Sequence, residues 1–149
     1  MATTFKDLNL SPQMQTAIDK LGFTNPTPIQ AKAIPALLGT NVDFHGQAQT
    51  GTGKTLAFGI PLLESIDSSN RATQALVIAP TRELVMQITQ ALKEVSGNMG
   101  ISVEPIYGGV SIENQLRQLR KGIHIVVGTP GRLNDLLNRR KLQIDTIKT

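Results

Sequence analysis

Apolar and polar positions follow two different periods along the chain, and the changes of period predict its elements. Short, mostly apolar runs predict strands near Asp43–Gln47, at Ala75–Ala79, near Val103–Tyr107 and at His124–Val127. Between and after them, apolar residues three or four positions apart predict helices from Lys54, over Arg82–Val95, Ile112–Arg120 and Arg132–Arg139. The chain therefore alternates strand and helix along most of its length.

This alternation predicts an α/β fold. Short apolar strands joined by helical crossovers are typical of a parallel sheet that helices cover on both faces. In such sheets, ligands bind beyond the carboxyl ends of the strands. The candidate functional loops, around positions 50, 80, 108 and 129, each follow a predicted strand.

Two short helices are expected ahead of the first strand. Ser11 and Thr27 are each followed by proline, which is typical of a capping residue before a helix that starts with Pro12 or Pro28. Gly22 can end the first of these helices. We therefore expect a helical segment over residues 1–40 and a βα core over residues 41–149, together forming a single domain.

Composition narrows the classes of protein that fit. The 149 residues contain no cysteine, which excludes disulfides and thiolate metal sites, and no run approaches the length of a membrane span. A cytoplasmic location is the default expectation. The net charge of +4 and the pI near 9.7 fit a polyanionic partner but also describe many proteins that bind no nucleic acid.

The sequence AQTGTGKT at positions 48–55 predicts a phosphate-binding loop. Gly51 and Gly53 let the backbone N–H groups point inward, and the following helix adds its positive end. Lys54 can reach the β and γ phosphates, and Thr55 can bind Mg²⁺. The alternative is a glycine-rich turn that binds nothing. The loop indicates a nucleoside triphosphate without indicating the reaction.

Further motifs make the pattern specific. FKDLNL and GFTNPTPIQ precede the loop, and APTREL, YGG and VGTPGR follow it in that order. The chain, from Phe5 to its last residues, resembles the first RecA-like domain of a DEAD-box ATP-dependent RNA helicase. The resemblance implies a RecA-like P-loop NTPase fold, with ATP and Mg²⁺ as cofactors and RNA as partner.

The resemblance also assigns the nucleotide site. It implies that Gln30 reads the edge of adenine and that Phe5 stacks on the ring, so that ATP is preferred over GTP. Gln30 as an ordinary helix residue and Phe5 as a core anchor are the alternatives. The phosphates would be held by Thr50, Gly51, Thr52, Gly53, Lys54 and Thr55, with Lys54 and Thr55 as the catalytic pair and Thr55 as the metal ligand.

The RNA site is implied in the same way. In the family, the PTREL, glycine-doublet and TPGR segments contact the sugar-phosphate backbone, so binding should be independent of base sequence and weaken with salt. Thr129 is a candidate helix cap, and Arg132 is expected to be free to reach a phosphate. The residues concerned are Pro80, Thr81, Arg82, Gly108, Gly109, Thr129, Pro130, Gly131 and Arg132. The basic run at 138–141 is expected to be a solvated helix end.

Two departures from the family pattern bear on function. His45 stands where branched apolar residues are usual, and we expect neither His45 nor His124 to bind metal or act in catalysis. The Asp-Glu-Ala-Asp motif does not occur, nor does the second RecA-like domain, so the chain resembles a fragment that ends just before that motif. We expect it to bind nucleotide without hydrolysing it or unwinding RNA alone.

Two other classes of protein remain as alternatives. A non-catalytic module could hold RNA or a partner and keep the nucleotide as a structural ligand. Another P-loop enzyme, such as a small kinase or a transport ATPase, would also explain the phosphate loop. It would leave GFTNPTPIQ, PTREL and TPGR without a role.

Overall fold

The computed structural model describes residues 4–49, 51 and 53–149. Its internal contacts divide the chain into two compact units. One unit comprises the chain up to Ser65 together with Glu94–Met99, and the other comprises Ile66–Lys93 together with Gly100–Thr149. The prediction of a single domain over residues 1–149 stays a prediction.

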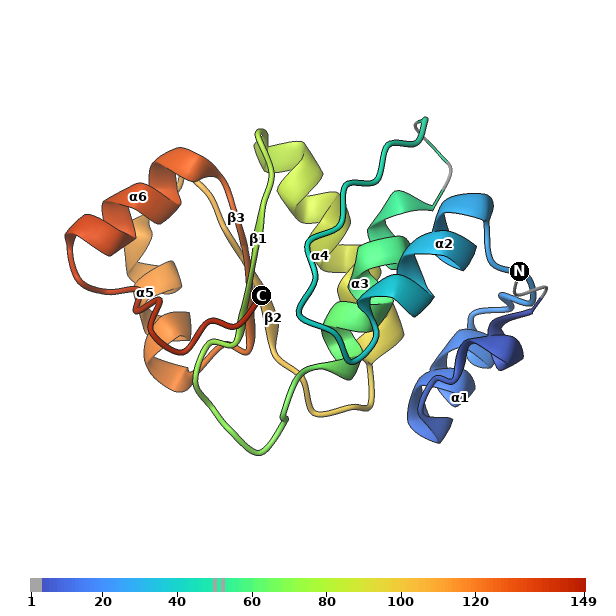
Figure 1. Ribbon diagram of the computed structural model, residues 1–149. Coiled ribbons are helices and arrows are strands. Elements are labelled where there is room, and N and C mark those ends of the chain that lie inside the picture. Colours follow the sequence, from blue (N-terminus) through green and yellow to red (C-terminus); the bar gives the residue numbers. More distant parts are fainter. Residues whose placement is uncertain (1–3, 50, 52) are drawn as a thin grey trace. The chain divides into compact units, whose positions relative to one another are not determined.

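The first unit is helical and carries the segment around the phosphate loop. It contains a 3-10 helix, η1 (Phe5–Leu8), and the helices α1 (Pro12–Lys20), α2 (Pro28–Leu37) and α3 (Lys54–Glu64) (Figure 1). The Ser11 hydroxyl accepts a hydrogen bond from the backbone N–H of Met14 at 3.1 Å. The Thr27 hydroxyl likewise accepts from the N–H of Gln30 at 3.4 Å, so both predicted caps are confirmed.

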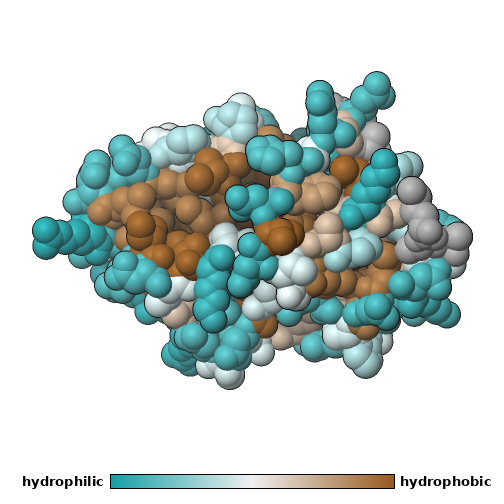
Figure 2. All heavy atoms as spheres, viewed as in Figure 1, coloured by the Kyte–Doolittle hydropathy of each residue, from teal (hydrophilic) through white to brown (hydrophobic). Residues whose placement is uncertain are grey.

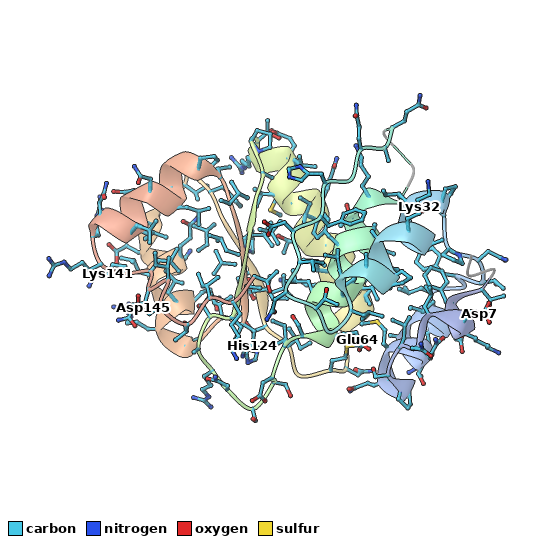
Figure 3. The ribbon with its side chains drawn as sticks, in the orientation of Figure 1. Asp7, Lys32, Glu64, His124, Lys141 and Asp145 are labelled. Atoms are coloured by element: carbon cyan, nitrogen blue, oxygen red, sulfur yellow. The ribbon has the colours of Figure 1, made fainter. Side chains whose placement is uncertain are left out.

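A carboxylate in this unit joins two helix ends. The hydroxyl and backbone N–H of Ser11 donate to the two carboxylate oxygens of Glu64, at 2.7 and 2.8 Å. Glu64, labelled in Figure 3, is the last residue of α3, and Ser11 stands directly before α1. Below these polar groups, Met14, Ile18, Ile34 and Ile60 are fully buried. The hydrogen bonds to Glu64 tie the end of α3, the helix that follows the phosphate loop, to the residue before α1.

The second unit is built on a parallel sheet of three strands in the order β1-β3-β2. The strands are β1 (Ala75–Ile78), β2 (Val103–Ile106) and β3 (Ile125–Gly128). Ile125 of the central strand lies opposite Ala75 on one side and Val103 on the other. All four residues of β3 are buried, as expected for a strand with neighbours on both edges and helices on both faces.

Helices flank this sheet. Figure 1 shows α5 (Ile112–Lys121) and α6 (Pro130–Asn138) on one side and α4 (Arg82–Ser96) on the other. The last turn of α4 belongs to the first unit. Leu133 and Leu136 of α6 pack with Ile106 and Val126 of the sheet, while Val85 of α4 is also fully buried. The predicted α/β class with a helix-flanked parallel sheet is therefore confirmed.

The strand predicted at Asp43–Gln47 is wrong. These residues have no regular secondary structure and are exposed, and His45 among them is exposed as well. A strand needs a hydrogen-bonding partner, but β1, β2 and β3 pair only with one another within the described part of the chain. The alternation of Val42, Asp43, Phe44 and His45 resembles a strand locally without having a neighbour to pair with.

The outer edge of β1 is covered only in part. The N–H of Leu76 donates to the carbonyl of Thr149, and the N–H of Lys148 donates to the carbonyl of Gln74, both at 2.9 Å. Ile78, at the other end of β1, is 60% exposed, and Ile144 is 54% exposed. Figure 2 shows apolar surface gathered over the part of this unit drawn around β1 and α6.

No helix within the described residues is both long and apolar enough to cross a membrane.

Candidate nucleotide and RNA sites

The predicted phosphate loop lies in the first unit and leads directly into a helix. Gly51 and Gly53 both have left-handed backbone angles, with φ of 80° and 82°, and α3 begins at Lys54. The first N–H groups of a helix have no partner within the helix and attract anions. Lys54 is exposed and Thr55 is half-buried. Thr50 and Thr52 lie outside the described residues.

Gly53 is enclosed as well as left-handed. A Cβ atom at this position would collide with Nε2 of Gln30 and would lie 3.2 Å from Cγ2 of Thr27. At Gly51 a Cβ atom would meet nothing within 4 Å. The loop therefore needs glycine at position 53 for two reasons, backbone conformation and space, and at position 51 for the first reason only.

Gln30 connects α2 to this loop. Its Nε2 donates to the carbonyl of Gly53 at 3.1 Å, and its Oε1 accepts from the N–H of Thr27 at 3.0 Å. The side chain is held between these partners, and the residue is only 4% exposed. The structure thus brings the segment predicted to read adenine into contact with the segment predicted to hold phosphate. That Gln30 reads adenine stays a prediction.

Phe5 is a core residue of the first unit. It is 3% exposed, and its N–H donates to the carbonyl of Thr24 at 3.2 Å. Its own carbonyl accepts from Nε2 of Gln15 at 2.7 Å. These contacts favour the anchoring role, and stacking of the ring on adenine stays a prediction.

The residues of this site suit a nucleotide with bound Mg²⁺, although only a few protein groups would contact the two ligands. A helix N-terminus and a lysine suit phosphates, and the Thr55 hydroxyl is an oxygen of the kind that Mg²⁺ prefers. Across the described residues, no group of three or more His, Cys, Asp or Glu side chains could hold a metal ion. His124 is buried, and its Nδ1 accepts from the N–H of Ser102 at 2.9 Å, which fits a structural role.

The predicted RNA segments all lie in the second unit. Pro80–Arg82 follow β1, Gly108 and Gly109 follow β2, and Thr129–Arg132 follow β3. Because the strands are parallel, these three segments meet at one edge of the sheet. The structure therefore brings together residues that are up to 52 positions apart in sequence, as counted from Pro80 to Arg132.

Two of these segments contact each other through Arg82. Thr81 caps α4, since its hydroxyl accepts from the N–H of Leu84 at 3.2 Å, and Arg82 is the first residue of that helix. The Arg82 guanidinium lies over the Tyr107 ring, 4.9 Å from its centroid. A cation placed on an aromatic face is stabilised by the ring electrons and held in a defined position. Arg82 itself is exposed.

Thr129 and Arg132 differ from what the sequence predicts. Thr129 occupies the position before α6, but its side chain makes no capping hydrogen bond. Its N–H donates instead to the carbonyl of Ile106 at 3.0 Å, which ties the turn to β2. Arg132 is not free, because its guanidinium donates to Oε1 of Gln115 at 2.9 Å and to the carbonyl of Val110 at 3.1 Å. Pro130 and Gly131 are exposed.

Gln115 is a residue that the sequence reasoning missed. It is 7% exposed, and its Nε2 donates to the carbonyl of Tyr107 at 2.9 Å while its Oε1 accepts from Arg132. It thereby links the glycine-doublet loop to the TPGR turn. A signal was available, because Gln115 stands within the apolar stripe of α5 formed by Ile112, Leu116 and Leu119.

Outside these segments, a surface turn carries a perturbed carboxylate. The hydroxyl and N–H of Ser69 donate to Asp67 at 2.6 and 3.0 Å, and these hydrogen bonds hold the pKa of Asp67 below its ordinary value. In the basic run, Arg139 pairs with Asp135 at 2.9 Å on the exposed end of α6. This contact fits the expected solvated helix end.

A left-handed glycine loop that opens a helix, in a chain that also forms a parallel sheet flanked by helices, is typical of the class of P-loop nucleotide-binding proteins. Within that class, residues 27–149 match the family model described as DEAD/DEAH box helicase, and the chain belongs to this family.

Relatives named DEAD-box ATP-dependent RNA helicase CshA share about half of the residues. The Geobacillus kaustophilus protein is 51% identical over 99% of the chain and 31% of its own length. The Bacillus subtilis protein is 50% identical over 100% of the chain and 30% of its own length. The chain thus spans under a third of the length of these curated relatives.

Solved structures confirm the RecA-like fold. Dbp5 of S. cerevisiae, bound to RNA and ADP BeF3, matches with a TM-score of 0.87 and 31% identity over 98% of the chain and 37% of the Dbp5 chain. A variant of the same protein, bound to Gle1, matches with a TM-score of 0.89 and 32% identity over 99% of the chain and 37% of its own.

Proposed function

We propose that this chain is the part of an ATP-dependent RNA helicase that binds ATP and one side of the RNA. The observation that carries the proposal is the hydrogen bond between Gln30 and the carbonyl of Gly53 at 3.1 Å. It joins the segment assigned to adenine and the segment assigned to phosphate within one unit. Because the chain spans about 30% of its CshA relatives, unwinding is proposed for a longer protein.

In the nucleotide site, the phosphates are held by the backbone N–H groups around Gly51 and Gly53 and by Lys54. Thr55 would hold Mg²⁺, which supplies positive charge to the phosphate oxygens when bound. The Asp-Glu-Ala-Asp sequence does not occur in the 149 residues, and the groups that orient water are therefore not among them. We propose binding of ATP by this chain without turnover. A cytoplasmic location fits the cysteine-free sequence and stays a prediction.

In the RNA site, contacts go to phosphate and sugar. Arg82 is exposed at the start of α4, and the starts of α4 and α6 present N–H groups at the same edge of the sheet. At Gly108 and Gly109 a Cβ atom would meet nothing within 4 Å, so the backbone there is open to a passing strand. The Dbp5 structure bound to RNA and ADP BeF3 supports both ligands for this fold.

A calorimetric titration with ADP and with GDP, in the presence of Mg²⁺, tests the nucleotide site. We expect ADP to bind more tightly than GDP, Lys54→Ala to weaken both, and Gln30→Ala to remove the preference for ADP. Gln87→Ala, an exposed glutamine on α4, is the matched control and should change neither. If the folded chain binds RNA but neither nucleotide, it is an RNA-binding module and the proposal fails.

A further inference from the structure

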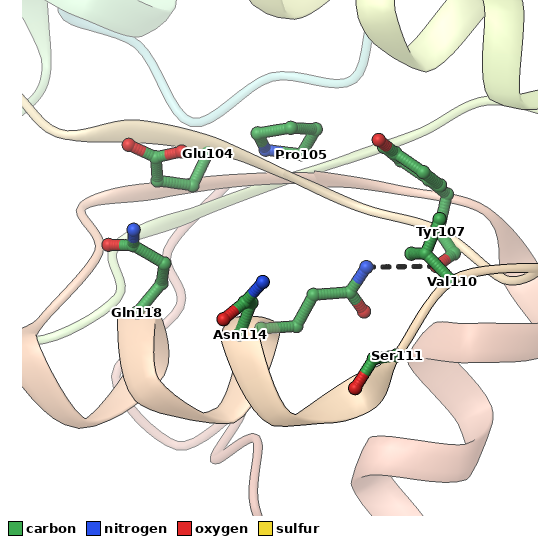
Figure 4. A pocket seen from close by; sticks show the side chains of 8 residues that line it. Glu104, Pro105, Tyr107, Val110, Ser111, Asn114 and Gln118 are labelled. Atoms are coloured by element: carbon green, nitrogen blue, oxygen red, sulfur yellow. Dashed lines mark hydrogen bonds between the residues drawn. The ribbon is translucent and has the colours of Figure 1, made fainter.

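A groove runs beside β2, next to the predicted RNA edge, and none of the motifs explains it. It has a volume of about 280 Å³ and lies between the outer edge of β2 and one face of α5 (Figure 4). Glu104 and Pro105 line it from β2, and Asn114 and Gln118 line it from α5. Tyr107 and Val110, which flank Gly108 and Gly109, stand at its end. The groove therefore opens where an RNA strand is expected to pass.

The polar groups in the groove are available to a ligand. Figure 4 shows the amides of Asn114 and Gln118 pointing from α5 toward β2. Both residues are exposed, and neither side chain has a hydrogen-bond partner among the residues described here. Gln115, which lies between them in the sequence, is already hydrogen-bonded to Tyr107 and Arg132, so its side chain is held in place where it lines the groove. Two amides one helical turn apart thus face one side of a narrow space.

The edge of β2 is closed to an added strand. The carbonyl of Ser102 accepts from the N–H of Ile125 in β3, and the carbonyl of Ile106 accepts from the N–H of Thr129 just after β3. The backbone groups of the alternate positions 103, 105 and 107 therefore point away from β3, toward the groove. Pro105 has no N–H to donate, and the carbonyl of Tyr107 is taken by Gln115. An extended peptide would find one donor missing and one acceptor occupied at successive positions. This argues against an added β-strand as the occupant of the groove.

We propose that the groove accepts one unstacked nucleobase of the RNA strand that passes Gly108 and Gly109. The proposal rests on the RNA binding proposed above and goes beyond it, because it adds a preference among bases to contacts that read only the backbone. Tyr107, with Arg82 over its ring at 4.9 Å, supplies an aromatic group at the groove. Asparagine and glutamine amides pair with base edges, adenine above all.

The groove also favours one chemical class of base. The Glu104 carboxylate can only accept hydrogen bonds. It forms a long salt bridge with Lys93, with 3.7 Å between Oε2 and Nζ. Acceptors of this kind select a base with an exocyclic amine, as carboxylates do with cytosine. Adenine, cytosine and guanine carry that amine, whereas uracil does not. The expected preference is therefore for amine-bearing bases over uracil.

Fluorescence anisotropy of the 149-residue chain with oligo(A), oligo(C) and oligo(U) of equal length tests this. At fixed salt, we expect oligo(A) and oligo(C) to bind about fivefold more tightly than oligo(U), the low end for one good base contact. The double variant Asn114→Ala, Gln118→Ala should lose part of the preference for oligo(A) over oligo(U), and adding Glu104→Ala should remove what remains of the preference for oligo(A) and oligo(C). Gln87→Ala should retain the preference.

The outcomes separate this inference from the proposed function. If no oligonucleotide binds, RNA binding itself fails. If all three bind alike before substitution, the base site is overturned while backbone binding stands. If the double variant weakens oligo(U) as much as oligo(A), the amides contact the backbone and the base site is again overturned. If the Asn114 and Gln118 side-chain NMR signals do not move with oligo(A), no base enters the groove and the base site is overturned.

Discussion

Gln115 is a buried polar residue on the apolar face of α5, and two hydrogen bonds satisfy its side-chain amide there. Its amide satisfies the carbonyl of Tyr107 and a donor of Arg132, both at 2.9 Å. Replacement of Gln115 by alanine leaves the Tyr107 carbonyl and one Arg132 N–H without this partner at a position that water reaches poorly. We expect Gln115→Ala to lower the free energy of unfolding by about 1–3 kcal/mol and to weaken RNA binding, since Arg132 and the Tyr107 loop lose a shared support.

Urea denaturation and RNA titration check this. Gln118→Ala, on the same helix but exposed, is the stability control and should unfold at an unchanged urea concentration. An equal midpoint for Gln115→Ala and the unchanged chain would show that the buried amide contributes no stability.

The glycines of the phosphate loop can be separated by substitution. Alanine at either position must adopt a left-handed backbone, at a cost of about 1–2 kcal/mol. Only at position 53 does the added methyl also displace Gln30, whose Nε2 it would strike. We therefore expect Gly53→Ala to reduce ADP affinity and the preference for ADP over GDP, and Gly51→Ala to retain that preference. Calorimetry with both nucleotides measures it, and equal loss of preference in the two variants would contradict the role of Gln30.

At the scale of elements, the helix starts at the RNA edge are built differently. The Thr81 hydroxyl caps α4, whereas Thr129 stands before α6 without capping it. We expect Thr81→Ala to lower the free energy of unfolding by about 1 kcal/mol and Thr129→Ala to have little effect. Thermal unfolding of the two variants, which lose the same atoms, gives the comparison. A larger loss at Thr129 than at Thr81 would refute this assignment of caps.

Helix caps and strands differ in how far the sequence alone can predict them. Ser11 and Thr27 cap their helices as predicted, because a cap depends on a few consecutive residues. Three of the four predicted strands are present, since each has an apolar run and a neighbour to pair with. The fourth, Asp43–Gln47, lacks a partner, and pairing between distant segments is not written in local periodicity. The expectation that Arg132 is free was wrong for a related reason, because its partner Gln115 lies 17 residues away. The contact of Arg132 with RNA stays a prediction.

At the scale of the whole molecule, the two predicted sites fall into different units. The described residues of the nucleotide site, from Phe5 to Thr55, belong to the first unit, and the RNA segments from Pro80 to Arg132 belong to the second. Each site therefore has its own core and its own supporting contacts. A substitution in one site should change the affinity for the ligand of that site. The affinity for the other ligand, measured alone, should stay unchanged.

Salt dependence makes this separation measurable. An RNA strand held through phosphates releases counterions, so log K falls with log salt by about 0.7 for each phosphate neutralised on a single strand. We expect Arg82→Ala to flatten that slope by about 0.7, whereas Arg82→Lys keeps the charge and the slope. Lys54→Ala should weaken the binding of ADP and leave the salt dependence of RNA binding unchanged. If Lys54→Ala instead flattens the slope, RNA contacts the phosphate loop and the two sites are not separate. If Arg82→Ala leaves the slope unchanged, the guanidinium serves the Tyr107 ring and no RNA phosphate.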